Sequence, residues 1–256
     1  YGLCEIYNLC AEKSRYDNLC FAHEDIQFDT IGWGEKIIPK LSETDCGVIG
    51  FAGTTARISA LCGIGLSRAH WRSNYIQHMN KGGMKSCFKN PDRVEFSPVV
   101  SVDGMCLFVS RKVWQEVRFD EKTFPNFHLY DLDFTSAVFR AGYINYICNT
   151  VIVEHFSEGY YTQEWLAATI DFNNKWRDAL PLYVSGFPCI KNLDRYVRSR
   201  EFRFIKAMMK SRGKCSWELI DGLCRQYYRK YPFYRSIVVW FHAYRYRKRW
   251  KREGRL

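Results

Sequence analysis

Hydrophobic positions along the first 160 residues switch repeatedly between strand and helix spacing. The first twelve residues show helical spacing through Leu3, Ile6, Tyr7 and Cys10. Short apolar runs predict strands over residues 18–22, 46–53, 99–109 and 143–153. The second runs into a glycine-rich turn, and the third contains a turn at Asp103-Gly104. Helical spacing returns over residues 34–41, 111–117 and 129–141, where Gly142 ends the last helix. This alternation of strands and helices indicates an α/β layered domain.

Two other stretches follow neither spacing as clearly. Residues 54–95 contain several glycines, which predict loops or a mobile insert. Pro181 and Pro188 mark a junction, and the alternating basic and aromatic residues beyond it predict two or three helices. We therefore expect a domain over residues 1–185 and a helical extension over residues 186–256.

Charge differs between these two parts. The 256 residues carry a net charge of +11, from 38 basic and 27 acidic side chains. Residues 191–256 hold 20 of the basic and 5 of the acidic residues, a balance of +15, which leaves −4 for residues 1–190. A hydrophobic content of 47% excludes a wholly disordered chain. No apolar run approaches the ~18 residues of a membrane-spanning helix.

The eleven cysteines point to a reducing compartment. No two of them are separated by two residues, so the spacing of a zinc ribbon or a redox pair is absent from the sequence. Most sit in apolar runs. We therefore expect reduced, buried thiols in a cytosolic protein.

Polar clusters follow two of the predicted strands. His23, Glu24 and Asp25 come directly after the strand over residues 18–22, and His155 follows the last strand. Ligands of open α/β sheets collect at the carboxyl ends of strands. A carboxylate there can hold a divalent cation with phosphate ligands, and a neutral imidazole can complete such a site. The alternative is a structural turn aspartate and a hydrogen-bonded structural histidine.

Two further carboxylates flank Leu132 at the start of the helix over residues 129–141. Residues two apart on a helix do not share a face, so we expect Asp131 and Asp133 to have different partners. One of them is a candidate general base, and the other would cap the helix or orient a neighbour. The alternative is that both are carboxylates favoured by the helix dipole.

Together, the order and spacing of these motifs resemble the family 2 glycosyltransferases. The likeness is greatest to the bacterial glycosyltransferase-like branch with a His-x-Asp metal motif, and it runs from Gly2 to about Gly159. The stretches that carry it include Tyr7-Asn8, His23-Glu24-Asp25, Gly50-Phe51-Ala52-Gly53, Val102-Asp103-Gly104, Phe127–Asp133 and His155-Phe156-Ser157-Glu158-Gly159.

This resemblance implies a GT-A fold, a nucleotide-binding α/β sandwich. Relatives begin with strands that hold the nucleobase, and this sequence starts after them, so we expect an N-terminally incomplete sandwich. The implied reaction is transfer of a sugar from a nucleoside diphosphate sugar, with inversion at the anomeric carbon and with Mg²⁺ or Mn²⁺. A cation neutralises the departing diphosphate, and a carboxylate takes the proton of the attacking hydroxyl.

Residue roles carry over from the matching motifs. Asp131 matches the general base. Asp25 and His155 match metal ligands, and so does His23, which stands where many relatives have an aspartate. The remaining residues would lie at the nucleotide-sugar donor: Asn8, Glu24, Asp103 and Gly104.

The basic extension suggests where the protein works. Basic residues interleaved with aromatics over residues 191–256 suit an anionic membrane surface, with Trp240 and Trp250 as apolar anchors. Helices packed on the catalytic domain are the alternative, and nucleic-acid binding is the least favoured interpretation.

We therefore expect a cytoplasmic glycosyltransferase, peripheral on the inner membrane face, that extends a glycan or lipid-linked acceptor in bacterial surface polysaccharide synthesis. The rival hypothesis is a catalytically silent GT-A-like domain that binds glycans or partners.

Overall fold

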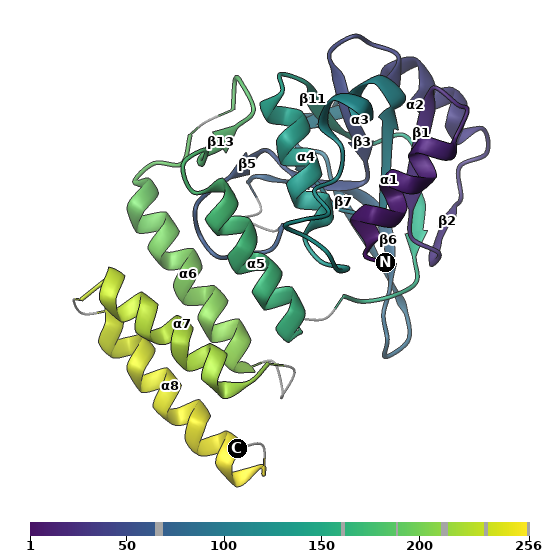
Figure 1. Cartoon of the computed structure of the whole chain (residues 1–256). Helices are drawn as coiled ribbons and strands as arrows, with labels where there is room; N and C mark the ends of the chain where they lie inside the picture. Colours follow the sequence, from purple (N-terminus) through teal and green to yellow (C-terminus); the bar gives the residue numbers. More distant parts are fainter. Residues whose placement is uncertain (65–68, 160–161, 188, 211–214, 233–234, 255–256) are drawn as a thin grey trace. The chain divides into compact units, whose positions relative to one another are not determined.

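A computed structural model describes residues 1–64, 69–159, 162–187, 189–210, 215–232 and 235–254 (Figure 1). The chain divides into two compact units. Unit 1 comprises residues 1–57, 63–159 and 178–188, and unit 2 comprises residues 58–62, 160–177 and 189–256. The structure therefore differs from a single division at residue 185, because the segment 160–177 groups with the C-terminal helices.

Unit 1 combines helices with two larger sheets. Its helices are α1 (Leu3–Lys13), α2 (Trp33–Leu41), α3 (Arg111–Val117) and α4 (Tyr130–Arg140). The first sheet has the strand order β1 (Asn18–Ala22), β10 (Cys106–Ser110), β3 (Cys46–Gly50), β11 (Ile144–Cys148) and β8 (Phe96–Val99). Strands β3 and β11 run parallel, and the other neighbours are antiparallel. The expected α/β class is confirmed.

The second sheet carries part of the candidate site. Its order is β2 (Ile26–Phe28), β12 (Val153–His155), β6 (Trp71–His78), β4 (Ala52–Thr54) and β9 (Ser101–Val102), with β7 (Met84–Lys89) paired to β6. Strands β5 (Ala56–Arg57) and β13 (Leu182–Tyr183) form a separate antiparallel pair.

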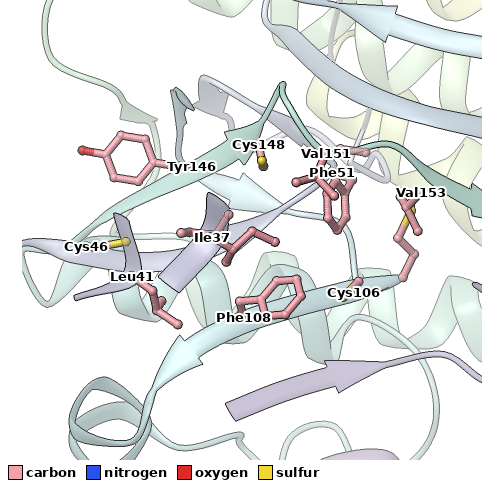
Figure 2. Close-up of a cluster of buried hydrophobic side chains, with 13 residues drawn as sticks. Ile37, Leu41, Cys46, Phe51, Cys106, Phe108, Tyr146, Cys148, Val151 and Val153 are labelled. Carbon is pink, nitrogen blue, oxygen red and sulfur yellow. The ribbon is translucent and has the colours of Figure 1, made fainter. Parts of the chain in front are cut away.

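A shared apolar core joins α2 to strands of both sheets (Figure 2). Phe51, in the step from β3 to β4, packs edge-on against Phe108 of β10 with ring centroids 6.3 Å apart. Ile37 of α2 and Val153 of β12 are fully buried in the same cluster. Each such side chain contributes about 1.5–3 kcal/mol by leaving water. This core fixes the strands from which the candidate metal ligands project.

Most local predictions for unit 1 are confirmed, and the glycine-rich turn is a correction. The predicted strand over residues 18–22 and the helix over residues 111–117 match β1 and α3. Residues 52–54 form strand β4 of the second sheet instead of a turn. Gly53 allows strands β4 and β9 to approach closely, because a Cβ atom at this position would lie 2.5 Å from the carbonyl oxygen of Ser101.

Two further predictions need correction. The segment expected to be loops or a mobile insert contains the hairpin β6–β7, with Gly82 and Gly83 at positive φ in its turn. Its burial follows no clean alternation, which hid the strands from a period-two search. The single strand expected over residues 143–153 is two strands, β11 and β12, which belong to different sheets.

Unit 2 is a helical bundle with its own core. It contains α5 (Gln163–Trp176), α6 (Leu193–Lys210), α7 (Trp217–Lys230) and α8 (Arg235–Arg252). The last three pack against one another (Figure 1). Residues from all four helices are fully buried in one cluster: Leu166, Met208, Ile220 and Val239. The prediction of two or three helices beyond Pro188 is confirmed.

The aromatic residues of the extension divide into two groups. Trp250 is 2% exposed and packs against Trp217 with ring centroids 5.3 Å apart, so its expected role as a membrane anchor is wrong. Trp240, by contrast, is 57% exposed. No helix in the described part of the chain combines the length and hydropathy needed to cross a bilayer.

The two tryptophans of α8 should differ in their effect on folding. Trp250→Ala should destabilise the protein by about 3–5 kcal/mol, because it leaves a cavity in the core of unit 2. The matched variant Trp240→Ala should change stability by less than about 0.5 kcal/mol. Denaturant unfolding of both variants measures the difference. Equal destabilisation would contradict the packing described for α8.

Candidate metal and catalytic site

Three side chains converge where strands β2 and β12 pair. His23 and Asp25 lie in the turn between β1 and β2, and His155 is the last residue of β12. The antiparallel register places His155 opposite Ile26, and the backbone N–H of Phe156 donates to the carbonyl oxygen of Asp25 at 2.9 Å. Backbone pairing therefore brings Asp25 and His155 together across 130 positions of sequence.

The geometry of this trio suits a divalent cation. Asp25 Oδ1 lies 3.6 Å from His155 Nε2 and 3.8 Å from His23 Nδ1. One ligand atom from each residue lies within 4.8 Å of the other two. The side chains of His23, Asp25 and His155 are 21%, 26% and 12% exposed, so solvent reaches the group. The expected proximity of Asp25 and His155 is confirmed.

The tautomer of His155 is set by Gln77 of β6. The Gln77 amide N–H₂ group donates to the carbonyl oxygens of His155 and Ser157, at 3.2 and 2.7 Å. Its Oε1 atom is therefore the acceptor that faces His155 Nδ1 at 3.2 Å. Nδ1 must carry the proton, which leaves the lone pair on Nε2 directed towards Asp25.

Tyr130 sets the tautomer of His23 in the same way. The Tyr130 hydroxyl donates its proton to the carbonyl oxygen of Gly104 at 3.1 Å, because a carbonyl can only accept. The hydroxyl oxygen then accepts from His23 Nε2, 2.9 Å away. His23 Nδ1 is left with its lone pair on the side of Asp25.

Both imidazoles therefore direct an unprotonated nitrogen towards the Asp25 carboxylate, and the three groups can share one cation. Burial lowers the pKa of His155, which keeps its ring neutral near pH 7. Among the described residues, its buried Nε2 atom has no hydrogen-bond partner. An unsatisfied buried polar atom costs about 1–3 kcal/mol, and a coordinated cation would remove that cost. Two imidazole nitrogens and one carboxylate oxygen suit a transition-metal ion such as Mn²⁺ better than Mg²⁺, which prefers oxygen ligands.

The trio is linked to Asp131 by hydrogen bonds. Gly104, whose carbonyl oxygen accepts from Tyr130, donates its N–H to Asp131 Oδ2 at 2.9 Å. A Cβ atom on Gly104 would lie 2.2 Å from the Tyr130 hydroxyl and 2.9 Å from Asp131 Cβ. Glycine at this position therefore allows the first turn of α4 to approach the turn that follows β9.

The carboxyl group of Asp131 has the acidity of a general base. Burial, followed by the negative charge of Asp103, raises the pKa of Asp131 to about 6. Burial also raises the pKa of Asp103. Asp131 remains half-buried and thus accessible to a substrate. A base with a pKa of about 6 is ionised at neutral pH and still basic enough to take a proton during reaction.

The remaining predicted residues lie in different surroundings. Glu24 is exposed in the same turn as His23 and Asp25. Asp133 is buried on α4 and is the largest charge that raises the pKa of Cys4, which burial itself raises to about 12. Asp131, by contrast, is half-buried and accepts from the backbone N–H of Gly104.

The expected donor-binding role of Asn8 is corrected to a structural one. Asn8 is 2% exposed, and its amide nitrogen donates to the carbonyl oxygen of Phe119 and to Glu121. Its amide oxygen accepts from the indole N–H of Trp114 and from the backbone N–H of Phe119. All four hydrogen-bonding positions are used within the protein, so Asn8 anchors α1.

Sequence reasoning missed Gln77 and the role of Tyr130. Tyr130 lies within a motif that was singled out, but its hydroxyl contacts are made to residues 26 and 107 positions away. Gln77 lies in a segment expected to be loop. In the sequence, Gln77 is only a polar residue that follows the apolar pair Tyr75-Ile76. Its role becomes visible only in the structure, where β6 pairs with β12.

Loss of Gln77 should weaken metal binding. Gln77→Leu removes the acceptor that orients His155, and such outer contacts are worth about 10–100-fold in metal affinity. Titration of the full chain with Mn²⁺, followed by electron paramagnetic resonance, measures this change. The matched variant Gln27→Leu, an exposed glutamine on β2, should bind Mn²⁺ like the wild type. Equal affinities for all three proteins would rule out the tautomer assignment.

Comparisons with known proteins identify the family of the chain. The model of the glycosyltransferase-like family matches residues 2–177. No curated protein matches the chain. One similar solved structure is GalNAc-T7 with UDP, GalNAc and Mn²⁺, at 10% identity, a TM-score of 0.45 and coverage of 78% of this chain. This chain spans 41% of that protein's length.

Another solved structure with similarity is A197 from STIV. It shows 14% identity and a TM-score of 0.37, and the match covers 74% of this chain and 78% of that one. The family match extends over more than half of the sequence and includes the metal trio and Asp131. The chain therefore belongs to the glycosyltransferase-like family.

Proposed function

We propose that the chain transfers a sugar from a nucleoside diphosphate sugar to a hydroxyl of a glycan or lipid-linked acceptor. One observation carries this proposal: hydrogen bonds through Tyr130 and Gly104 connect the metal trio to a carboxylate with a pKa of about 6. A cation site next to a general base is the equipment that a single displacement requires. The expected setting is bacterial surface polysaccharide synthesis.

In the proposed reaction Asp131 accepts the proton of the acceptor hydroxyl. The acceptor oxygen forms a bond to the anomeric carbon while the bond from that carbon to the diphosphate oxygen breaks. A single displacement inverts the configuration and uses no nucleophile of the enzyme. His23, Asp25 and His155 would hold a divalent cation, which neutralises the charge of the departing diphosphate. Asp103 and Gly104 would lie beside the donor, and exposed Glu24 at its edge.

Helix α8 supports the further proposal of an anionic membrane surface as partner. Four of its residues at positions i, i+3, i+4 and i+7 are between 50% and 65% exposed: Ile237, Trp240, Phe241 and Tyr244. Residues 235–252 include seven basic and no acidic residues. An apolar stripe on a strongly basic helix is typical of helices that lie in a membrane interface. This arrangement would bring the enzyme to a lipid-linked acceptor on the inner face of the membrane.

Removal of the candidate base should lower turnover and leave donor binding almost unchanged. Asp131→Asn should lower turnover by about 10²-fold or more with little change in donor binding. Turnover of the wild type should rise with pH through about 6, as Asp131 ionises. Asp103→Asn should move this rise to lower pH, because it removes a neighbouring negative charge. Steady-state assays with a panel of nucleotide sugars measure these effects.

The same substitution should stabilise the fold at neutral pH. A carboxyl whose pKa is raised on folding stabilises the protein below its unfolded pKa, and that stability is lost as pH rises through about 6. Asp131→Asn should therefore raise the free energy of unfolding at pH 7, by up to about 3 kcal/mol. The exposed control Asp45→Asn should change neither property. Lower stability with unchanged turnover would make Asp131 structural, and no turnover by the wild type with any donor and metal would favour a silent domain.

Membrane binding should have a salt-dependent and an apolar component. The full chain should sediment with vesicles containing phosphatidylserine at low salt, and binding should fall steeply with added salt. The double variant Trp240→Ala, Phe241→Ala should lose the salt-resistant part. Tyr16→Ala, which removes an aromatic that is 76% exposed in unit 1, is the control. If the full chain ignores anionic vesicles at low salt, α8 is not a membrane surface.

A further inference from the structure

Unit 2 contains a cavity that no step of the proposed reaction uses. Its volume is about 560 Å³, and it lies among α5, α6, α7 and the segment over residues 58–62. Small-molecule sites typically measure about 300–1,000 Å³. All residues that line it belong to unit 2, so the cavity is formed within one compact part of the chain.

The wall of this cavity holds a buried carboxylate that is paired with a lysine. Glu201 is 8% exposed, and its Oε1 atom accepts from Lys230 Nζ at 2.8 Å. The side chain of Lys230 is 51% exposed, so this ion pair stands at the open side of the cavity, where a polar ligand can contact it.

Asn173 supplies a second acceptor. Its amide nitrogen donates to the carbonyl oxygen of Thr169 at 2.9 Å, which fixes the orientation of the side chain. Its Oδ1 atom is buried and has no hydrogen-bond partner among the described residues. A ligand that donates a hydrogen bond would remove a cost of about 1–3 kcal/mol.

Hydrogen-bond donors and apolar side chains complete the lining of the cavity. Arg177, Gln226 and Lys230 contribute donors near the rim, and Tyr227 presents an aromatic ring that is 3% exposed. Leu223 and Ile205 add apolar wall. Each ligand hydroxyl can both donate and accept, so a polyhydroxylated ligand can meet the acceptors and donors together. A lipid chain would leave Asn173 Oδ1 without a hydrogen-bond partner.

We propose that this cavity binds a neutral saccharide, at a site separate from His23, Asp25 and His155. Saturation-transfer difference NMR on the full chain tests the proposal, with glucose, galactose, N-acetylglucosamine, rhamnose and lactose as probes at millimolar concentration. At least one probe should give a signal with the wild type. Asn173→Leu and the rim variant Gln226→Ala should each weaken binding by about tenfold.

Two controls make the test decisive. Glu218→Gln, an exposed glutamate on the same helix as Gln226, should bind like the wild type. Asp25→Ala should also retain binding, whatever its effect on sugar transfer, so failure of the proposed reaction leaves this result unaffected. The proposal is overturned if no probe gives a signal, if Asn173→Leu and Gln226→Ala both bind like the wild type, or if Asp25→Ala abolishes the signal.

Discussion

The Tyr130 hydroxyl is the contact on which the candidate site depends. It accepts from His23 and donates to the Gly104 carbonyl, so one oxygen orients a candidate metal ligand and holds the turn that contacts Asp131. Tyr130 is 3% exposed, and burial raises its pKa strongly, which keeps the hydroxyl protonated and able to donate. The positions of the candidate base and of the candidate metal ligands therefore depend on the same hydrogen bonds.

Residues at and next to the candidate site also carry a free-energy cost for folding. The backbone of Leu129, which precedes Tyr130, adopts a left-handed conformation with φ of +63°. Such a conformation in a residue with a side chain costs about 1–3 kcal/mol and persists where surrounding packing enforces it. The raised pKa of Asp131 is a second cost of the same kind. The apolar core around Phe51 and Phe108 stabilises the strands on which α4 packs.

Local structure was predictable from the sequence where periodicity was clear. Strand β1 and helix α3 follow from apolar spacing, and α4 ends where Gly142, at φ of +103°, permits it. The β6–β7 hairpin was not predictable, because its strands are neither alternating nor uniformly apolar. The pairing of Asp25 with His155 was anticipated from strand ends. The partner that orients His155 was not, since no spacing rule connects positions 77 and 155.

Asn8 shows the limit of reasoning from a resemblance. A motif position indicates where a residue lies, but the four hydrogen bonds of its amide show what that side chain does. The central claim is that His23, Asp25 and His155 form one cation site next to Asp131. Anomalous diffraction from crystals of the chain grown with Mn²⁺ tests it most directly. We predict a single strong peak within bonding distance of His23 Nδ1, an Asp25 carboxylate oxygen and His155 Nε2. A manganese peak at other side chains, with this trio empty, would contradict the account.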